Sequence, residues 1–264
     1  MAAPLAGHTN SYHTYGLDEA LAGIAAAGFR GVELSAVPGW TQHLDLSGTE
    51  EIRRTLARHG LTAVSLSAHS DLTTRAGLQH GVKAVRWAAD VGIPIVNTAI
   101  GGHASQEENE RGFLDNVGKL ADAAEAARVI VALEIHGDIM ATGEKTLALL
   151  RKIGRPNVIK VNYDTANVEY YGGVRAVDDL PKIAPYVAHV HLKDTIGGRG
   201  VWNFPALGSG TVDFARVLEI LRRADYTGPY SVELEFQGEP WPSLAEVTAA
   251  MRRSYAHLRS LGLS

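Results

Sequence analysis

The segments VIVALEIH (residues 129–136) and VIKVNYDT (residues 158–165) are apolar, β-branched runs that each end in polar or charged residues. A helical pattern separates them, so together they have the form of a βαβ unit. Counting these two, eight such runs recur at intervals of roughly thirty residues, the length of one βα repeat. The other six are LAGHTNSY (5–12), FRGVELSA (29–36), TAVSLSAH (62–69), IPIVNTAI (93–100), YVAHVHLK (186–193) and YSVELEF (230–236). This alternation predicts a single (β/α)8 TIM barrel domain over residues 1–264, with a doubly wound sheet as the weaker alternative.

The helical patterns between these runs carry recognisable start and stop signals. Three serines are followed three residues later by a glutamate, which predicts capping boxes at Ser47–Glu50, Ser105–Glu108 and Ser243–Glu246. The alanine-rich pattern over residues 17–27 ends at Gly28, which predicts a helix C-terminal cap.

Composition narrows the classes of function. The 264 residues have a formal net charge of -4, which gives no support to nucleic-acid binding. The absence of cysteine excludes disulfides and thiolate metal ligands. No run of apolar residues is long enough for a membrane span, and the first residues do not form a secretory signal. We therefore expect a cytoplasmic protein with no membrane partner.

Polar side chains recur where the predicted strands end. In a parallel barrel the carboxyl ends of the strands meet at one face, which is where barrel enzymes place their active sites. Buried carboxylates there need partners, and a divalent cation would neutralise several together. The residues in question are Glu33, His69, Glu134, His136, Asp164, His189, His191, Glu233 and Glu235. For Glu33 and His69, a structural role satisfied by neighbouring strand-end groups is an equal alternative.

Five motifs resemble those of the sugar phosphate isomerase/epimerase family, the xylose isomerase-like barrels that include ketose 3-epimerases. They are ALEIHGD (132–138), VNYDTANVEYYGG (161–173), HVHLKD (189–194), GSGTVDF (208–214) and YTGPYSVELEF (226–236). They occur in the expected order over essentially the whole chain.

The resemblance implies one divalent metal ion, with Mn²⁺ expected first and Mg²⁺ or Co²⁺ as alternatives. Its ligands would be Glu134, Asp164, His191 and Glu233, and Glu134 and Glu233 would also be the catalytic acid/base pair. His189 lies deeper on the same strand face as His191 and is expected to support it or to belong to the core.

Several residues are candidates for substrate binding. Lys193 is predicted to emerge at the rim of the barrel, where it could meet a substrate oxygen or an anion. His136 and His103 are candidates for binding a substrate hydroxyl or for orienting Glu134, and His69 is a further candidate for substrate binding. Trp202 lies in a glycine-rich loop that suits a sugar face or a lid. A loop that packs its own aromatic residues is the alternative for Trp202.

Asn167 departs from the family pattern, because ketose epimerases usually have a histidine three residues after the aspartate. A neutral amide does not titrate, so the substrate contact at this position must differ. Asp194, which ends the separate HVHLKD motif, is expected to pair locally as a loop or helix-start residue.

The expected activity is that of a sugar isomerase or epimerase: proton abstraction next to a carbonyl through a metal-bound enediolate. A metal-dependent lyase acting on a 3-keto-glycoside, keto-sugar or keto-acid is the nearer alternative. A nuclease similar to endonuclease IV is less favoured, because that fold relative uses a three-zinc cluster and a basic surface. The expected partner is a small sugar, and a non-phosphorylated sugar is favoured over a phosphorylated one. The family resemblance also leads us to expect a homo-oligomer.

Overall fold

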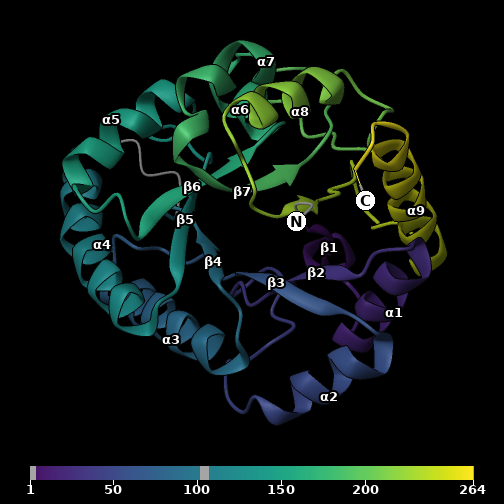
Figure 1. Ribbon diagram of the computed structural model, residues 1–264, viewed down its shortest axis with the longest axis horizontal. Helices are drawn as coiled ribbons and strands as arrows, with labels where there is room; N and C mark the ends of the chain where they lie inside the picture. Colours follow the sequence, from purple (N-terminus) through teal and green to yellow (C-terminus); the bar gives the residue numbers. More distant parts are fainter. Residues whose placement is uncertain (1–3, 102–106, 264) are drawn as a thin grey trace.

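The computed structural model describes residues 4–101 and 107–263, and its centre is a closed barrel of eight parallel strands in the order β1 to β8 (Figure 1). Each strand pairs with the next in the sequence, and β1 also pairs with β8 to close the barrel. The strands are β1 (Leu5–His8), β2 (Gly31–Ser35), β3 (Thr62–Ser67), β4 (Ile95–Thr98), β5 (Ile130–Glu134), β6 (Ile159–Asp164), β7 (Val187–Leu192) and β8 (Tyr230–Val232). All eight lie within the apolar runs read from the sequence, so the predicted barrel is confirmed, and a doubly wound sheet is wrong.

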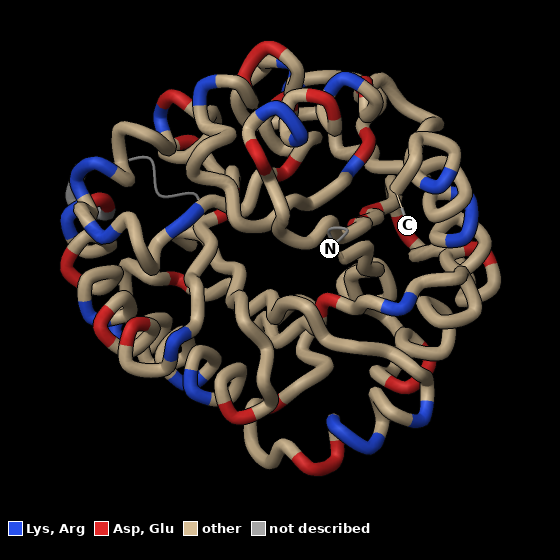
Figure 2. Tube along the Cα trace, viewed as in Figure 1, with Lys and Arg blue, Asp and Glu red and all other residues tan. Residues whose placement is uncertain are grey.

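The helices form a ring around this barrel and cover its outer face (Figure 1). They are α1 (Leu17–Ala27), α2 (Glu50–His59), α3 (Arg75–Val91), α4 (Glu107–Ala127), α5 (Gly143–Ile153), α6 (Asn167–Gly172), α7 (Ala176–Asp179), α8 (Phe214–Arg223) and α9 (Leu244–Ser260). Their buried apolar side chains pack against those of the strands in one continuous core. Lysine, arginine and acidic residues alternate around the outer ring rather than gathering on one side (Figure 2). Of the helices in the described part of the chain, none is long and apolar enough to cross a membrane.

Two of the four helix ends predicted from capping signals are found in the structure, one is wrong, and one lies outside the described residues. Ser243 and Glu246 form the expected capping box at the start of α9, and Gly28 ends α1 in the left-handed conformation at φ 113°. The box at Ser47 is wrong, because α2 begins at Glu50 and the Ser47 hydroxyl donates instead to Asp45 at 2.6 Å. An aspartate two residues away offers a charged acceptor that competes with the helix. Ser105 lies outside the described residues.

Polar groups enter the barrel interior because strand side chains alternate between its two sides. On β7, Val190 points outward into the helical layer, and His189 and His191 point inward, where both are fully buried. The interior is therefore not uniformly apolar, and its polar residues require the partners described next.

Candidate active site

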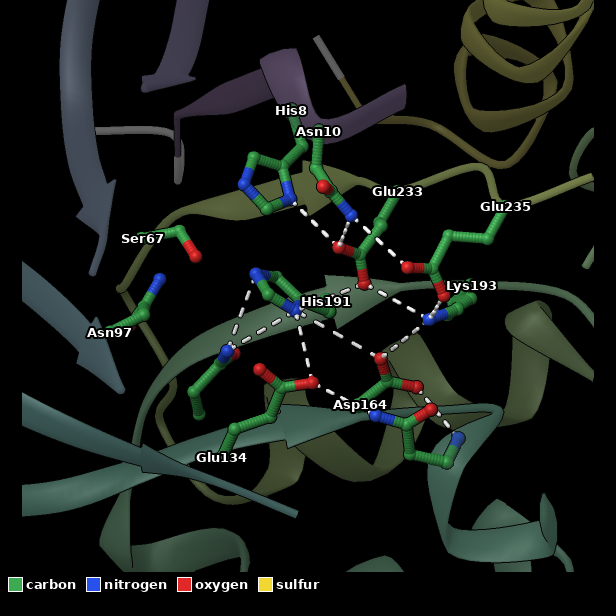
Figure 3. A network of polar contacts seen from close by, with 12 residues as sticks. His8, Asn10, Ser67, Asn97, Glu134, Asp164, His191, Lys193, Glu233 and Glu235 are labelled. Atoms are coloured by element: carbon green, nitrogen blue, oxygen red, sulfur yellow. Dashed lines mark hydrogen bonds and ion pairs between the residues drawn. The ribbon is translucent and has the colours of Figure 1, made fainter. Parts of the chain in front are cut away.

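Four side chains converge at the carboxyl ends of β5 to β8. Glu134 is the last residue of β5, Asp164 is the last of β6, His191 lies near the end of β7, and Glu233 follows β8 directly. Each offers one ligand atom, and these four atoms all lie within 4.8 Å of one another. Figure 3 shows the three carboxylates arranged around the His191 ring. The four predicted ligands are thus brought together by strand ends that are far apart in the sequence.

The His191 ring divides its two nitrogens between two environments. Nδ1 lies 3.4 Å from Glu233, 3.6 Å from Glu134 and 3.9 Å from Asp164. Nε2 lies 3.0 Å from Glu33 Oε2, so a proton on Nε2 is donated to that carboxylate. Burial alone would lower the pKa of His191, but the surrounding carboxylates outweigh it and raise the pKa well above its usual value. Glu33 thus favours the tautomer whose Nδ1 is free to bind a metal.

Asp164 has one oxygen without a hydrogen-bond partner. Oδ1 accepts from the backbone N–H groups of Ala166 and Asn167 at 2.8 and 2.7 Å. Among the described residues Oδ2 accepts no hydrogen bond, and it lies 3.9 Å from Lys193 Nζ. Burial raises the pKa of Asp164 to about 7, with Lys193 acting in the opposite direction. An orphaned carboxylate oxygen beside two other carboxylates and an imidazole fits a divalent cation that prefers oxygen and nitrogen donors.

The two glutamates each have an ordered set of neighbours. The Asn167 amide donates to Glu134 Oε1 at 2.9 Å, and His69 Nε2 lies 2.8 Å from Glu134 Oε2. Burial alone would raise the pKa of Glu134, but His191 and His69 hold it well below its usual value. Asn167 and His69 therefore orient this carboxylate, and Asn167 does so without a charge of its own.

Glu233 is oriented by two residues of β1 and its loop, which the sequence analysis did not single out. His8 Nδ1 lies 3.0 Å from Glu233 Oε1, and the Asn10 amide donates to the same oxygen at 2.9 Å. Asn10 also donates to Glu235 Oε1 at 3.1 Å. His8 stands at a strand end like the residues that were selected, so the same rule applied to the first run would have found it.

His8 also belongs to a second group with metal-ligand chemistry. His8, Glu33 and His191 offer buried ligand atoms within 4.8 Å of one another. Glu33 is fully buried, and it accepts from the Asn97 amide at 2.5 Å as well as from His191. The group shares His191 with the first set, so the two sets form one continuous polar cluster.

Lys193 differs from its prediction. It was expected to emerge at the rim, but the residue is only 3% exposed and its ammonium group lies among carboxylates. Nζ donates to Glu233 Oε2 at 3.2 Å and to Glu235 Oε2, and it lies 4.4 Å from the centre of the Phe204 ring. Burial alone would lower the pKa of Lys193, but Glu233 and Glu235 outweigh it and raise the pKa. The lysine compensates negative charge within the cavity wall.

His189 occupies a deeper level of the barrel than His191. Its Nδ1 donates to Asn162 Oδ1 at 2.9 Å, and its Nε2 accepts from the Ser65 hydroxyl at 2.9 Å. Burial lowers its pKa to about 3, which keeps the ring neutral. The expectation that His189 supports the site or belongs to the core fits this geometry.

A cavity of about 340 Å³ opens above the cluster, within the size range of ligand pockets. Its lining includes both glutamates and five of the predicted substrate-binding residues, namely His69, His136, Asn167, Lys193 and Trp202. Burial lowers the pKa of His136 to about 4, and Tyr171 lies 3.0 Å from its Nε2. His103, the sixth candidate, lies outside the described residues.

Asp194 organises the loop that carries Trp202. Its carboxylate accepts from the backbone N–H groups of Gly208, Gly210 and Val212 at 2.8 to 3.1 Å. The expectation that Asp194 pairs locally is confirmed. The Trp202 ring packs against Tyr170 and Phe204, so this loop does pack its own aromatic residues, and Trp202 still lines the cavity.

Fold and site together define a (β/α)8 barrel with a carboxylate-rich cavity on the face where barrel enzymes hold their active sites. The model of the xylose isomerase-like TIM barrel family matches residues 21–261, and the chain belongs to this family. This membership confirms the resemblance seen in the sequence motifs.

The relatives include sugar epimerases. The chain is 30% identical over 189 residues to L-ribulose-5-phosphate 3-epimerase UlaE of Escherichia coli K12, across 70% of this chain and 63% of that protein. It is 28% identical over 236 residues to UlaE of Salmonella paratyphi B, across 85% and 81% of the two chains. The solved structure of L-ribulose 3-epimerase shares the fold, with a TM-score of 0.78, 20% identity and coverage of 98% and 94%. Epimerases are isomerases, the class that was expected from the sequence.

Proposed function

We propose that this protein is a divalent-metal-dependent sugar epimerase or isomerase that removes a proton from the carbon next to a carbonyl. One observation carries the proposal: Glu134 and Glu233 approach His191 from opposite sides, with Asp164 between them (Figure 3). Two carboxylates on opposite sides of one cavity are what proton removal and return at a single carbon require. The epimerase relatives support a small sugar as the substrate.

The metal would be held by Glu134, Asp164, His191 and Glu233. Mn²⁺ is the first candidate, and Mg²⁺ and Co²⁺ accept the same oxygen and imidazole donors. When bound, the ion polarises a carbonyl and stabilises the negative charge that develops on its oxygen. The unpartnered Oδ2 of Asp164 supports this assignment, because a metal would supply the partner that the described residues do not.

Proton transfer is assigned to the two glutamates. One carboxylate takes the proton from the sugar carbon, and the other carboxyl, protonated from solvent, returns a proton on the opposite face. Return to the same carbon gives an epimer. Return to the neighbouring carbonyl carbon gives an aldose or ketose isomer, provided that the hydroxyl proton of the first carbon passes to the former carbonyl oxygen. Burial would raise the pKa of Glu233, but Lys193 and His191 hold it well below its usual value. Glu134 and Glu233 are thus both ionised at rest, so either carboxylate can accept the first proton.

The proposal is tested by incubating the Mn²⁺-loaded protein in D₂O with free ketoses and 3-keto-glycosides. We expect deuterium at the carbon next to the carbonyl together with an epimer or isomer, measured by mass spectrometry. Loss of water or of an aglycone would indicate the lyase alternative. No exchange with any member of the panel would contradict the proposal.

Two variants connect the exchange to the assigned residues. Glu134→Gln and Glu233→Gln should each reduce deuterium exchange by about 10²- to 10⁴-fold, the usual contribution of a general acid or base. Glu144→Gln is the matched control, because Glu144 is an exposed glutamate in the first turn of α5. A double variant of Glu134 and Glu233 that kept full exchange would remove both residues from the mechanism.

A further inference from the structure

The cavity has an acidic lining. Its carboxylates, with that of Asp164 beneath, belong to Asp71, Glu134, Asp164, Glu233 and Glu235. Lys193 is the only lysine or arginine that lines it among the described residues, and the segments outside them, 1–3, 102–106 and 264, contain neither residue type. Lys193 is already held by Glu233 and Glu235.

This charge distribution is unsuited to a phosphate group. The five carboxylates exceed the three positive charges that a divalent cation and Lys193 would supply together. Phosphate sites in proteins commonly use free Arg or Lys side chains, and the described lining offers none. The side chains of the described lining therefore favour an uncharged sugar over a sugar phosphate.

Trp40 forms a fixed aromatic surface at the mouth of this cavity. It lies in the segment between β2 and α2 and lines the cavity, with 46% of the residue exposed. One face of its indole stacks on the His13 ring, with ring centres 4.5 Å apart and planes 15° apart. His13 is held in turn by the Trp241 ring at 4.2 Å, in an edge-on arrangement. His13 stacks on one face of the indole, and Trp40 nevertheless lines the cavity and is 46% exposed, so part of the ring is available to a ligand.

Trp40 is separate from the proton-transfer machinery. Glu134, Asp164, His191 and Glu233 lie at the strand ends and are nearly or fully buried, whereas Trp40 belongs to the segment between β2 and α2 and is half-exposed. If the reacting sugar ring lies at the carboxylates, Trp40 would contact a substituent of that ring that extends towards solvent. The C–H bonds of a second sugar ring, or an aromatic aglycone, pack well on an indole face.

We propose that Trp40 is an outer subsite that binds the aglycone or second sugar of an uncharged glycoside, while the reacting ring lies against Glu134 and Glu233. This inference rests on the proposed function. Where the reacting ring itself forms the glycosidic bond, its anomeric carbon is an acetal and has no carbonyl, so the carbonyl beside the abstracted proton is a ketone at another carbon of that ring. The substrate is then supplied by an oxidoreductase that removes two electrons and two protons from a ring hydroxyl.

The test compares three forms of each of several hexoses: the free sugar, its 6-phosphate and its phenyl glycoside. Their affinities for the Mn²⁺-loaded protein are measured by isothermal titration calorimetry. For at least one sugar, the phenyl glycoside should bind about tenfold more tightly than the free sugar, as expected for burial of one aromatic ring on another. The 6-phosphate should bind most weakly.

Variants locate the effect on the indole. Trp40→Ala should remove the advantage of the phenyl glycoside and leave the affinity for the free sugar unchanged, and Trp40→Phe should restore part of it. His13→Ala should give an intermediate loss, because it removes the support behind the ring. Ile196→Ala is the control, since Ile196 is also an exposed apolar residue but does not line the cavity.

Three results would overturn the subsite: equal affinity for free and phenyl forms, tightest binding of the phosphate, or equal loss of all forms in Trp40→Ala. A dimer that dissociates on Trp40→Ala, seen by sedimentation with no phenyl advantage, would assign Trp40 to a subunit contact instead. Failure of the proposed function is distinguished separately, because Mn²⁺ binding and deuterium exchange on free ketoses do not involve Trp40.

Discussion

The two inward-facing histidines of β7 lie two residues apart and have different surroundings. His189 has a neutral hydrogen-bond partner for each ring nitrogen, in Asn162 and Ser65, and one carboxylate nearby, because its Nε2 lies 3.6 Å from Glu33 Oε2. His191 is surrounded by carboxylates, and one oxygen of the neighbouring Asp164 has no hydrogen-bond partner among the described residues. At the deeper level, around His189, both ring nitrogens have hydrogen-bond partners. At the upper level, around His191, the clustered carboxylates carry negative charge that a bound cation would neutralise. We therefore expect His189 to stabilise the barrel and His191, at the next inward position of the same strand, to take part in metal binding.

The largest difference between the two levels should appear in metal binding. His191→Ala should weaken Mn²⁺ binding by more than about a hundredfold, since even the residues that orient a metal ligand are worth about 10- to 100-fold. His189→Ala should weaken it far less. Calorimetric titration of the metal-free protein with Mn²⁺ measures both, and equal losses would contradict the choice of His191 as the ligand.

Glu33 connects the two levels, so its replacement should have an intermediate effect. Glu33→Gln keeps the size of the side chain but removes the charge that holds the proton on His191 Nε2. We expect Mn²⁺ affinity to fall by about 10- to 100-fold. The matched control is Glu144→Gln, and unchanged affinity in Glu33→Gln would show that Glu33 has only a structural role.

The two levels should also differ in the sign of their effect on stability. His189→Ala should lower the free energy of unfolding by about 1–3 kcal/mol, because it leaves the Asn162 amide oxygen and the Ser65 hydroxyl unpaired. Asp164→Asn should raise that of the metal-free protein at pH 8 by about 1–2 kcal/mol, because it removes a buried charge. Asparagine can still accept the two backbone hydrogen bonds of Asp164. Urea unfolding of the metal-free variants measures both changes, and destabilisation by Asp164→Asn would contradict this difference.

The smallest effect concerns pH. The pKa of Asp164 is raised to about 7 in the metal-free fold, so the neutral carboxyl favours that fold at low pH and this contribution is lost as pH rises through 7. Metal binding needs the carboxylate and must release the proton. Mn²⁺ affinity should therefore fall as pH is lowered from 8 to 6, by up to about tenfold per pH unit below 7 for this one group. Titrations at several pH values measure the slope, and a constant affinity would show that Asp164 is ionised throughout.

The sequence by itself determined the barrel and the four converging strand ends. Period-two and helical patterns are local, and they alternated without interruption from Leu5 to Ser260. The rule that parallel strands present their carboxyl ends at one face then placed Glu134, Asp164 and Glu233 among nine strand-end candidates, and the family resemblance identified them as ligands before any contact was known. The local rule failed at Ser47, because Asp45 competed for its hydroxyl.

Only the tertiary structure decided which neighbours each of these side chains has. Closure of the barrel places β1 beside β8, so His8 and Asn10 meet Glu233 across more than two hundred residues of sequence. Lys193 is buried because Glu233 and Glu235 lie within reach of its ammonium group, a compensation that its own strand does not reveal. The stack of Trp40, His13 and Trp241 is likewise assembled from three separate segments. Charge pairing and ring stacking depend on the distances between residues in the folded protein, and the pattern of residues along the sequence does not contain those distances.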